Sequence, residues 1–252
     1  MELRAGNMVE EACVVDGDAV ILFDRRRAAQ AGVDWLDPAH WHHGTRAADR
    51  GGRGAVWFVR GPFGEAVLRH YRRGGLVARL SADRYLWTGA DRTRSFREFR
   101  LLAELQRRGL PVPAPLVAGY RRAGAFYRAD LLTLRVPAAR TLAELLPFAL
   151  LDEALLASLG RVLARFHAEG VHHADLNAHN LLLDGDGHWW LIDFDRGVLL
   201  QPARRWQQAR LLRLRRSLLK LGAAAMPGWP QAWQWLQAAH DDAVDAVMPA
   251  QA

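Results

Sequence analysis

Three polar side chains near residue 180 have the types and the order that phosphoryl transfer needs. Asp175 and Asn180 lie on one short segment that begins at His173, and Asp193 follows an apolar run that ends at Ile192. One carboxylate can orient an acceptor hydroxyl and take its proton, while a carboxamide and a second carboxylate offer the oxygen ligands that Mg²⁺ prefers. We therefore predict Asp175 as the catalytic residue and Asn180 and Asp193 as the metal ligands.

The elements around these residues predict a hairpin between the two parts of the site. Two short apolar strands, 181–183 and 188–192, flank the turn sequence Asp184-Gly185-Asp186-Gly187. The segment His173-Ala-Asp-Leu-Asn-Ala-His-Asn180 followed by Asp193-Phe194 matches the kinase pattern H-x-D-L-x-x-x-N with a later D-F-G. The alternative is a turn rich in Asn, Asp and His that only caps local backbone.

Hydrophobic periodicity divides the chain into a β-rich first half and a helical second half. In the first half we predict strands at 55–60, 65–71, 117–121 and 125–134, and a helix at 94–108 that ends at Gly109. In the second half we predict helices at 152–169, capped by Asp152, and at 204–221 and 230–247. This order indicates an α+β, bilobal, protein-kinase-like fold, with an amino-terminal nucleotide-binding lobe at 1–135 and a catalytic and acceptor lobe at 136–252.

Two features of the first half are candidates for nucleotide binding. A glycine cluster, Gly51-Gly52-Arg53-Gly54, precedes the first predicted hairpin, so Gly52 and Gly54 would cover the nucleotide phosphates; such clusters also mark ordinary turns. Arg69 stands on the second strand of that hairpin, where kinases carry a lysine, and the only lysine is Lys220. Arg69 is the predicted cation for the α and β phosphates, and a solvated strand residue is the alternative.

Glu98 on the predicted helix 94–108 is the candidate ion-pair partner of Arg69, with Glu104 as the alternative. A rival explanation exists for Glu98, because Ser95-x-x-Glu98 is also the pattern of a helix capping box.

The charge of the chain points to anionic partners. Lys and Arg number 34 against 27 acids, which gives a net charge of +7. Guanidinium groups bind phosphates and carboxylates bidentately, although a GC-rich genome would also enrich arginine. The stretch 204–220 alternates arginines with five leucines (Leu211, Leu212, Leu214, Leu218 and Leu219), which suits either an anionic membrane surface or a core-facing helix with a solvated basic face.

The remaining composition places limits on location and class. No apolar run approaches the ~20 residues of a membrane-spanning helix, and the first residues carry charge without an apolar signal segment, so we expect a protein on the cytoplasmic side of the membrane. Cys13 is the only cysteine, which excludes an intramolecular disulfide and a cysteine-based zinc site. The histidines of His40-Trp41-His42-His43 are expected at the surface, and His173 is expected to be structural.

Beyond its kinase pattern, the chain resembles the lipopolysaccharide-core kinases that act on 3-deoxy-D-manno-octulosonic acid (Kdo), within the protein-kinase-like superfamily. The resemblance rests on residues 51–58, 67–79, 85–87, 95–102, 110–114, 171–180, 191–197 and 205–221. It implies the use of ATP and Mg²⁺ to phosphorylate the 4-hydroxyl of a Kdo sugar on a lipid A precursor, by a peripheral protein at the cytoplasmic face of the inner membrane. By this resemblance Asp175 is catalytic and Asn180 and Asp193 hold the metal.

The sequence departs from the wider kinase pattern at two points. D-F-G reads Asp193-Phe194-Asp195, with the glycine delayed to Gly197, and no A-P-E segment follows. Both departures favour a small or glycan acceptor over a protein.

Four other functions are alternatives to this one. They are a heptose kinase of the lipopolysaccharide core, an aminoglycoside-type phosphotransferase, a nucleic-acid-binding protein, and a glycosyltransferase that uses Asp184-Gly-Asp186 or Asp193-Phe-Asp195 as a DxD metal motif. An aminoglycoside enzyme needs an acidic acceptor pocket, which a basic chain disfavours, and nucleic-acid binding leaves the three polar residues unexplained, so no nucleic-acid partner is expected. The oligomeric state is left open.

Overall fold

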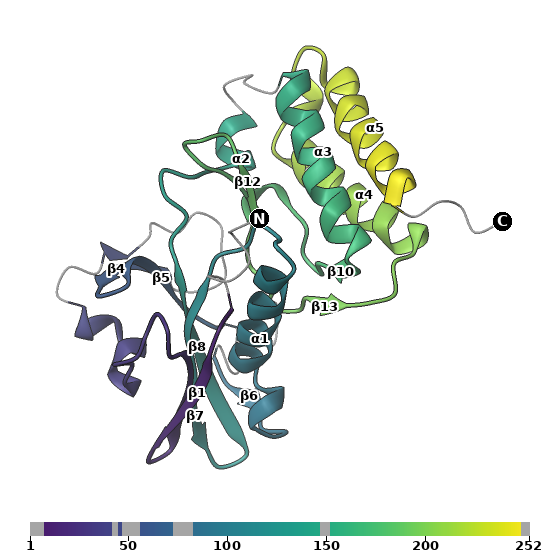
Figure 1. Cartoon of the computed structure of the whole chain (residues 1–252). Helices are drawn as coiled ribbons and strands as arrows, with labels where there is room; N and C mark the ends of the chain where they lie inside the picture. Colours follow the sequence, from purple (N-terminus) through teal and green to yellow (C-terminus); the bar gives the residue numbers. More distant parts are fainter. Residues whose placement is uncertain (1–7, 42–44, 47–55, 73–82, 147–151, 248–252) are drawn as a thin grey trace. The chain divides into compact units, whose positions relative to one another are not determined.

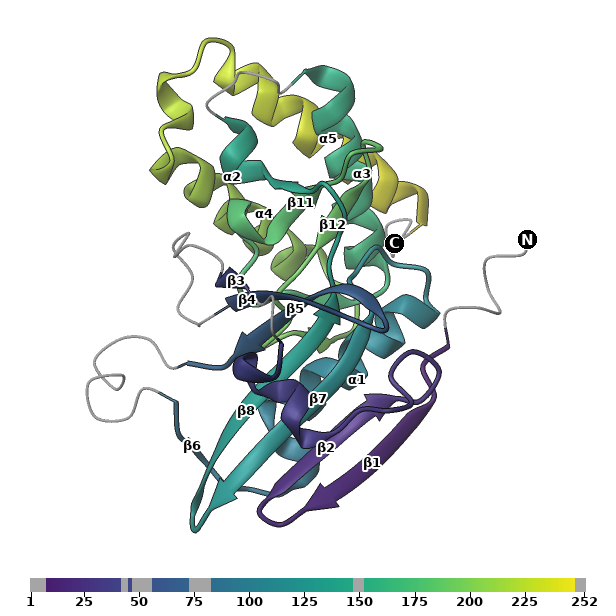
Figure 2. The same cartoon turned by 90° about the vertical axis from the view of Figure 1, so that its left-hand side faces the viewer.

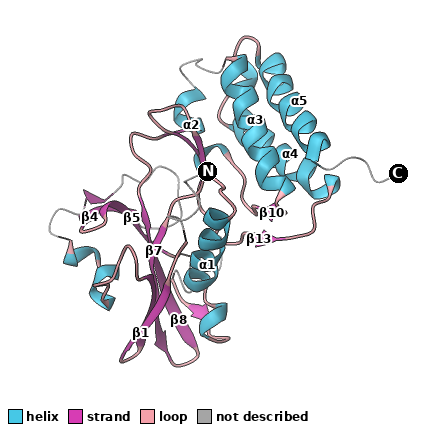
Figure 3. Ribbon diagram, in the orientation of Figure 1, coloured by secondary structure: helices cyan, strands magenta, loops and turns pink. Residues whose placement is uncertain are grey.

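The structure, a computed structural model, describes residues 8–41, 45–46, 56–72, 83–146 and 152–247. The chain forms two compact units. The first unit comprises residues 1–109 and 113–135, and the second comprises 110–112 and 136–252. Figure 3 shows most of the strands in the first unit and most of the helices in the second, so the protein is of mixed α and β class.

An antiparallel sheet in the order β1-β2-β7-β8-β5-β4-β3 forms the first unit, with β6 paired to β8. Its strands are β1 (Glu11–Asp16), β2 (Ala19–Asp24), β3 (Thr45–Arg46), β4 (Val56–Gly61), β5 (Gly64–His70), β6 (Tyr85–Leu86), β7 (Pro115–Ala123) and β8 (Phe126–Leu134). The predicted hairpin is confirmed as β4–β5, and the strands predicted at 117–121 and 125–134 are β7 and β8. The β1–β2 hairpin was not predicted, although its turn at Gly17-Asp18 is a hairpin signal.

Helix α1 (Arg94–Arg107) packs against β7, and it agrees with the helix predicted at 94–108. Figure 2 shows α1 on one face of the sheet and the segment 25–41 on the other. That segment contains two short 3-10 helices, Val33–Leu36 and Pro38–His40. A third, Ala90–Arg92, precedes α1. The core under 25–41 is apolar and includes Ile21, Phe23, Trp35, Trp41, Leu116 and Leu132.

Helices build most of the second unit, as Figure 1 shows. They are α2 (Leu142–Leu145), α3 (Glu153–Ala168), α4 (Arg204–Lys220) and α5 (Trp229–Val247), with 3-10 turns at Ala178–Asn180 and Ala223–Ala225. The predicted helices correspond to α3, α4 and α5, and Asp152 caps α3 as predicted, because its side chain accepts a hydrogen bond from the Leu155 amide. Helices α3 and α5 pack closely at Gly160, where a Cβ atom would lie 2.3 Å from the carbonyl oxygen of Leu236.

Short strand pairs frame the segment that carries the predicted site. Strand β11 (Leu181–Leu183) pairs with β12 (Trp189–Leu191) and with β9 (Arg140–Thr141), and β10 (Val171–His172) pairs with β13 (Val198–Leu199). The hairpin predicted on either side of the Asp184–Gly187 turn is therefore present. It places Asp193 two residues beyond β12, and β11 follows the segment 173–180 directly.

Candidate active site

The segment 173–180, which the sequence predicts to be the catalytic loop and which keeps that name below, is held in shape by its own side chains. The ring Nε2 of His173 donates to the carbonyl of Ile192 at 3.0 Å. The side-chain Nδ2 atoms of Asn177 and Asn180 donate to the backbone carbonyl of Asp175 at 3.1 and 3.0 Å. A carbonyl only accepts, so His173 carries its proton on Nε2. The amide of Asn180 must likewise present nitrogen to Asp175 and keep its oxygen, Oδ1, for another partner.

His173 has the structural role that the sequence predicted. Its side chain is 3% exposed and lies edge-on to the ring of Phe194, with 4.8 Å between the ring centroids. Burial lowers the pKa of His173 below its ordinary value, against the opposing effect of the bond to Ile192 and of the charges of Asp193 and Asp175. The imidazole is thus neutral, and it ties the catalytic loop to the strand end that precedes Asp193.

Asp175 forms an ion pair with Arg213 of α4. Both the Nε and the Nη2 of Arg213 donate to the same oxygen of Asp175, Oδ1, and the Nε contact measures 3.0 Å. Partial burial would raise the pKa of Asp175, but the hydrogen bonds from Arg213 and Asn177 outweigh it and hold the pKa below the ordinary value. The carboxylate is therefore ionised at neutral pH, ready to accept the hydrogen bond of an acceptor hydroxyl.

Helix α4 supports the catalytic loop at two further points. Nη1 of Arg210 donates to the carbonyl of Ala174 at 3.0 Å, and the Ser217 hydroxyl accepts from the amide of Ala178 at 3.2 Å. Residues 210, 213 and 217 lie on one face of the helix because they are three and four positions apart. The sequence predicted a basic stretch at 204–220, but it gave no sign that α4 contacts the catalytic loop.

The structure brings Asn180 and Asp193 to the same place as Asp175. The amide of Ile192 donates to the carbonyl of Asn180 at 3.0 Å, and the charges of both Asp175 and Asp193 act on the His173 ring. Asp193 has a φ of 64°, a left-handed conformation that non-glycine residues rarely adopt and that is concentrated at functional sites. Oδ1 of Asn180 and the carboxylate of Asp193 are the hard oxygen donors that suit Mg²⁺, so the donor set fits the predicted ion.

In the first unit, Arg69 of β5 forms the predicted ion pair with Glu98 of α1. The Nη2 of Arg69 donates to Oε2 of Glu98, and the hydroxyl of Tyr71 donates to the same oxygen at 2.6 Å. The Glu98 side chain is 2% exposed and that of Arg69 is 20% exposed. Tyr71 was missed by the sequence reasoning, since nothing in its type or spacing predicts a contact with a glutamate 27 residues away.

The capping box at Glu98 and the alternative partner for Arg69, Glu104, are both wrong. The N-cap of α1 is Thr93, without a side-chain capping bond, and the hydroxyl of Ser95 instead donates to the carbonyl of Gly119 at 2.8 Å. Glu104 pairs with Arg107 and Arg108 at 2.7 Å on the surface of the helix. The hydrogen bond from Arg107, and the further contacts with both arginines, lower the pKa of Glu104 to about 2.

Several predicted residues lie outside the described ranges. These are Gly52 and Gly54 of the glycine cluster, and His42 and His43. His40 is exposed, as predicted, and its Nδ1 lies 2.9 Å from Oδ2 of Asp34.

The Asp184–Asp186 motif serves the hairpin turn. Asp184, Asp186 and His188 offer ligand atoms within 4.8 Å of one another. However, Oδ1 of Asp184 accepts from the amides of Asp186 and His188, and its Oδ2 accepts from the indole of Trp190 at 2.7 Å. These bonds account for Asp184 as a turn residue, without a metal.

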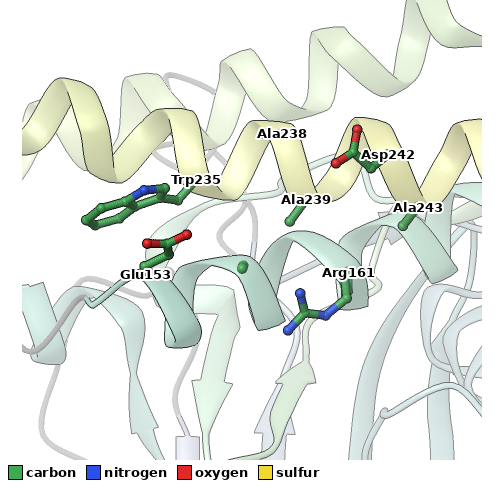
Figure 4. A pocket seen from close by; sticks show the side chains of 8 residues that line it. Glu153, Arg161, Trp235, Ala238, Ala239, Asp242 and Ala243 are labelled. Carbon is green, nitrogen blue, oxygen red and sulfur yellow. The ribbon is translucent and has the colours of Figure 1, made fainter.

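An open groove of about 450 Å³ lies between α3 and α5 (Figure 4). It is lined by Glu153, Ala157, Arg161, Trp235, Ala238, Ala239, Asp242 and Ala243. None of the predicted site residues lines it, so the groove and the catalytic loop are separate features of the second unit. Among the described residues, no helix is long and apolar enough to cross a membrane.

An ionised aspartate, followed by an asparagine and a strained aspartate in this order, is typical of a phosphotransferase of the kinase type. Residues 39–239 match the model of the lipopolysaccharide kinase (Kdo/WaaP) family. The chain is 53% identical over 212 residues to a 3-deoxy-D-manno-octulosonic acid kinase of Stenotrophomonas maltophilia, and 56% identical over 212 residues to one of Xanthomonas campestris pv. campestris. Each alignment covers 81% of this chain and 82% of the relative. The chain belongs to the lipopolysaccharide kinase (Kdo/WaaP) family.

Proposed function

We propose that this protein transfers the γ-phosphoryl group of ATP, with Mg²⁺, to the 4-hydroxyl of a Kdo sugar on a lipid A precursor. The observation that carries the proposal is the arrangement of the second unit. The side chain of Asn180 binds the carbonyl of Asp175, and the charges of Asp175 and Asp193 both act on the ring of His173. Family membership and the names of the relatives support a sugar acid as the acceptor.

The parts of the chain take different roles in this proposal. Residues 1–135 form the nucleotide-binding lobe, in which Arg69 contacts the α and β phosphates, Glu98 orients its guanidinium, and Gly52 and Gly54 cover the phosphates. Residues 136–252 form the catalytic and acceptor lobe. Asp175 orients the acceptor hydroxyl and takes its proton, and Asn180 and Asp193 hold the Mg²⁺ that neutralises charge on the phosphates. The bilobal kinase-like arrangement belongs to the same proposal.

The exposed side of α4 supports a peripheral contact with the anionic inner membrane from the cytoplasmic side. Leu211, Leu214 and Leu218 are buried, so they belong to the core. Leu212 and Leu219 are 48% and 36% exposed and lie seven residues apart on one face. Exposed cations flank them at Arg205, Arg215, Arg216 and Lys220. The helix contains no acidic residue, and each cation near an anionic surface contributes ~1 kcal/mol to binding.

A radiolabelled ATP assay tests the proposal. The purified chain is offered a Kdo-bearing lipid A precursor, a heptosylated acceptor without an accessible Kdo, and an aminoglycoside, and the phosphorylated position is mapped by NMR. Phosphate on O4 of Kdo is the expected product. Transfer to heptose or to the aminoglycoside alone would replace the proposed acceptor, and no transfer to any of the three would refute the activity.

Sedimentation with vesicles tests the membrane contact separately. Binding to vesicles that contain anionic lipid, and not to neutral vesicles, is expected, and the double variant L212S/L219S should release the protein. Equal binding of the wild type to both kinds of vesicle would contradict the proposed electrostatic contact.

A further inference from the structure

Arg213, the partner of Asp175, is a cation with N–H donors that its pair with Asp175 does not use. A guanidinium group has five N–H donors in a planar fork, and Arg213 directs its Nε and Nη2 at a single oxygen of Asp175. Within the part of the chain that the structure describes, no other acceptor is bound to Arg213. The side chains of Arg213 and Asp175 are 42% and 55% exposed, so a ligand can reach both.

The surroundings of this pair carry an excess of positive charge. The charges of Arg213, Arg216 and Asp175 all act on Arg210, and of these three only that of Asp175 is negative. Burial, and then the charges of Arg213 and Arg216, lower the pKa of Arg210 below its ordinary value. The Nε of Arg210 is buried and has no acceptor among the described residues. The charge of Asp175 thus offsets only part of the positive charge around Arg210, which leaves room for a second anion.

We propose that Arg213, supported by Arg210, forms a binding site for the carboxylate of the acceptor sugar and so determines specificity for a sugar acid. This inference rests on the proposed function. The remaining N–H donors of Arg213 bind the sugar carboxylate while its Nε and Nη2 keep Asp175 in place, so one side chain fixes both the carboxylate and the base that receives the hydroxyl proton.

A carboxylate fits this site better than a neutral group. The planar fork of arginine matches the two oxygens of a carboxylate, and such charge-assisted pairs are roughly twice as strong as neutral hydrogen bonds. A neutral sugar, such as a heptose without an acid group, would leave the three guanidinium groups without a second counter-charge. Arg213 would therefore distinguish acceptors by charge next to the reacting hydroxyl.

The experiment compares two acceptors and three variants. The acceptors are the Kdo-bearing lipid A precursor and the same molecule with its Kdo carboxylate converted to the neutral methyl ester. The variants are R213Q, R213K and, as a matched control, R161Q, which removes an exposed arginine of α3 in the same unit. The kcat/KM for each acceptor and the KM for ATP are measured, and thermal unfolding confirms that each variant is folded.

The wild type and R161Q should prefer the acid to the ester by roughly 10- to 100-fold in kcat/KM, which is the size of one charged hydrogen-bond pair. In R213Q this preference should fall to near unity with the KM for ATP unchanged, and R213K should retain part of it. If R213Q still prefers the acid to the ester as the wild type does, the inference is overturned, whether or not its activity falls. If R213Q keeps this preference and also has a raised KM for ATP, Arg213 binds the nucleotide phosphates instead. If the wild type phosphorylates neither acceptor, the proposed function itself fails.

Discussion

The protein contains two arginine–carboxylate pairs at its predicted site residues, and they differ in burial. Glu98 in the first unit is 2% exposed and is also bound by Tyr71, whereas Asp175 in the second unit is 55% exposed and its Oδ1 accepts from two donors of Arg213. A buried pair cannot exchange its partner for water without a large desolvation cost, while an exposed pair can open with little loss. The first pair therefore stabilises the fold around a cation, and the second is suited to make new contacts when substrates bind.

Removal of the carboxylate from the exposed pair should have the largest effect. We expect D175A to lower kcat by ~10²–10⁴ through the loss of base and orientation, with stability little changed. Steady-state kinetics with the Kdo acceptor and binding of Mg·ATP by calorimetry measure this. Wild-type turnover in D175A would refute the assignment of the catalytic residue.

Removal of the carboxylate from the buried pair should instead affect stability. Because Glu98 is 2% exposed and is ion-paired with Arg69, E98A removes one partner of a buried ion pair and should reduce the free energy of unfolding by about 3–5 kcal/mol. Urea denaturation measures the change. The matched control is E104A on the same helix, whose pairs with Arg107 and Arg108 lie at the surface and contribute ~0–1 kcal/mol. Equal losses in the two variants would remove the contrast between buried and exposed pairs.

The Y71F variant measures how much Tyr71 contributes to the stability of the buried pair. Y71F removes the 2.6 Å hydrogen bond to Glu98 and the 3.2 Å hydrogen bond from Nη2 of Arg69, but leaves the ring and the ion pair. Because hydrogen bonds to charged groups contribute about 1.5–3 kcal/mol, the expected loss in unfolding free energy is within that range and below that of E98A. A loss as large as that of E98A would mean that Tyr71, and not Arg69, is the main partner of Glu98.

A fall in pH should change the stability of the two units in opposite directions, and this is the smallest of the four predicted effects. In the second unit His240 donates from Nδ1 to Asp241 and accepts from Nδ1 of His167, and burial lowers the pKa of both histidines. Their contribution to stability is present above the ordinary pKa of 6.5 and is lost as the pH falls from there toward the folded-state values. In the first unit the hydrogen bond to Asp130 raises the pKa of His70 despite burial, so its contribution is complete below 6.5 and is lost as the pH rises through the folded-state pKa.

Hydrogen exchange at about pH 7.5 and pH 5.5, corrected for intrinsic exchange rates, measures both units in one experiment. Protection of α3 and α5 should fall at the lower pH, while protection of β5 and β8 should hold or rise. A parallel loss in both units would show that other groups control the response to acid.

Local patterns predicted most of this molecule, and contacts between distant segments account for the rest. The catalytic loop, the β11–β12 hairpin and the cap at Asp152 each follow from a few neighbouring residues. The partner of Glu98 could be predicted only as one of several possibilities, because a capping box and an ion pair need the same residue type at the same place. The structure decides between them through the hydrogen bonds of Ser95 and Arg69.

Helix α4 shows most clearly what the sequence could not predict. Its sequence predicted a basic amphipathic helix, but it could not tell which leucines are buried, and Leu211, Leu214 and Leu218 turn out to face the core. Arg213 lies 38 residues after Asp175 in the sequence, so no spacing rule links them. The roles of Gly52 and Gly54 stay predictions.

Helix α4 presents different sides to the core, to the catalytic loop and to solvent. This arrangement limits the height of Asp175 above a membrane on which the helix rests. If its exposed leucines rest on lipid, the catalytic carboxylate stands above the bilayer by no more than the thickness of one helix, which is on the order of 10 Å. A sugar joined directly to the lipid would fall within that height, whereas sugars farther out in a glycan chain would pass over it. The enzyme would then select its acceptor sugar by its height above the bilayer as well as by its charge.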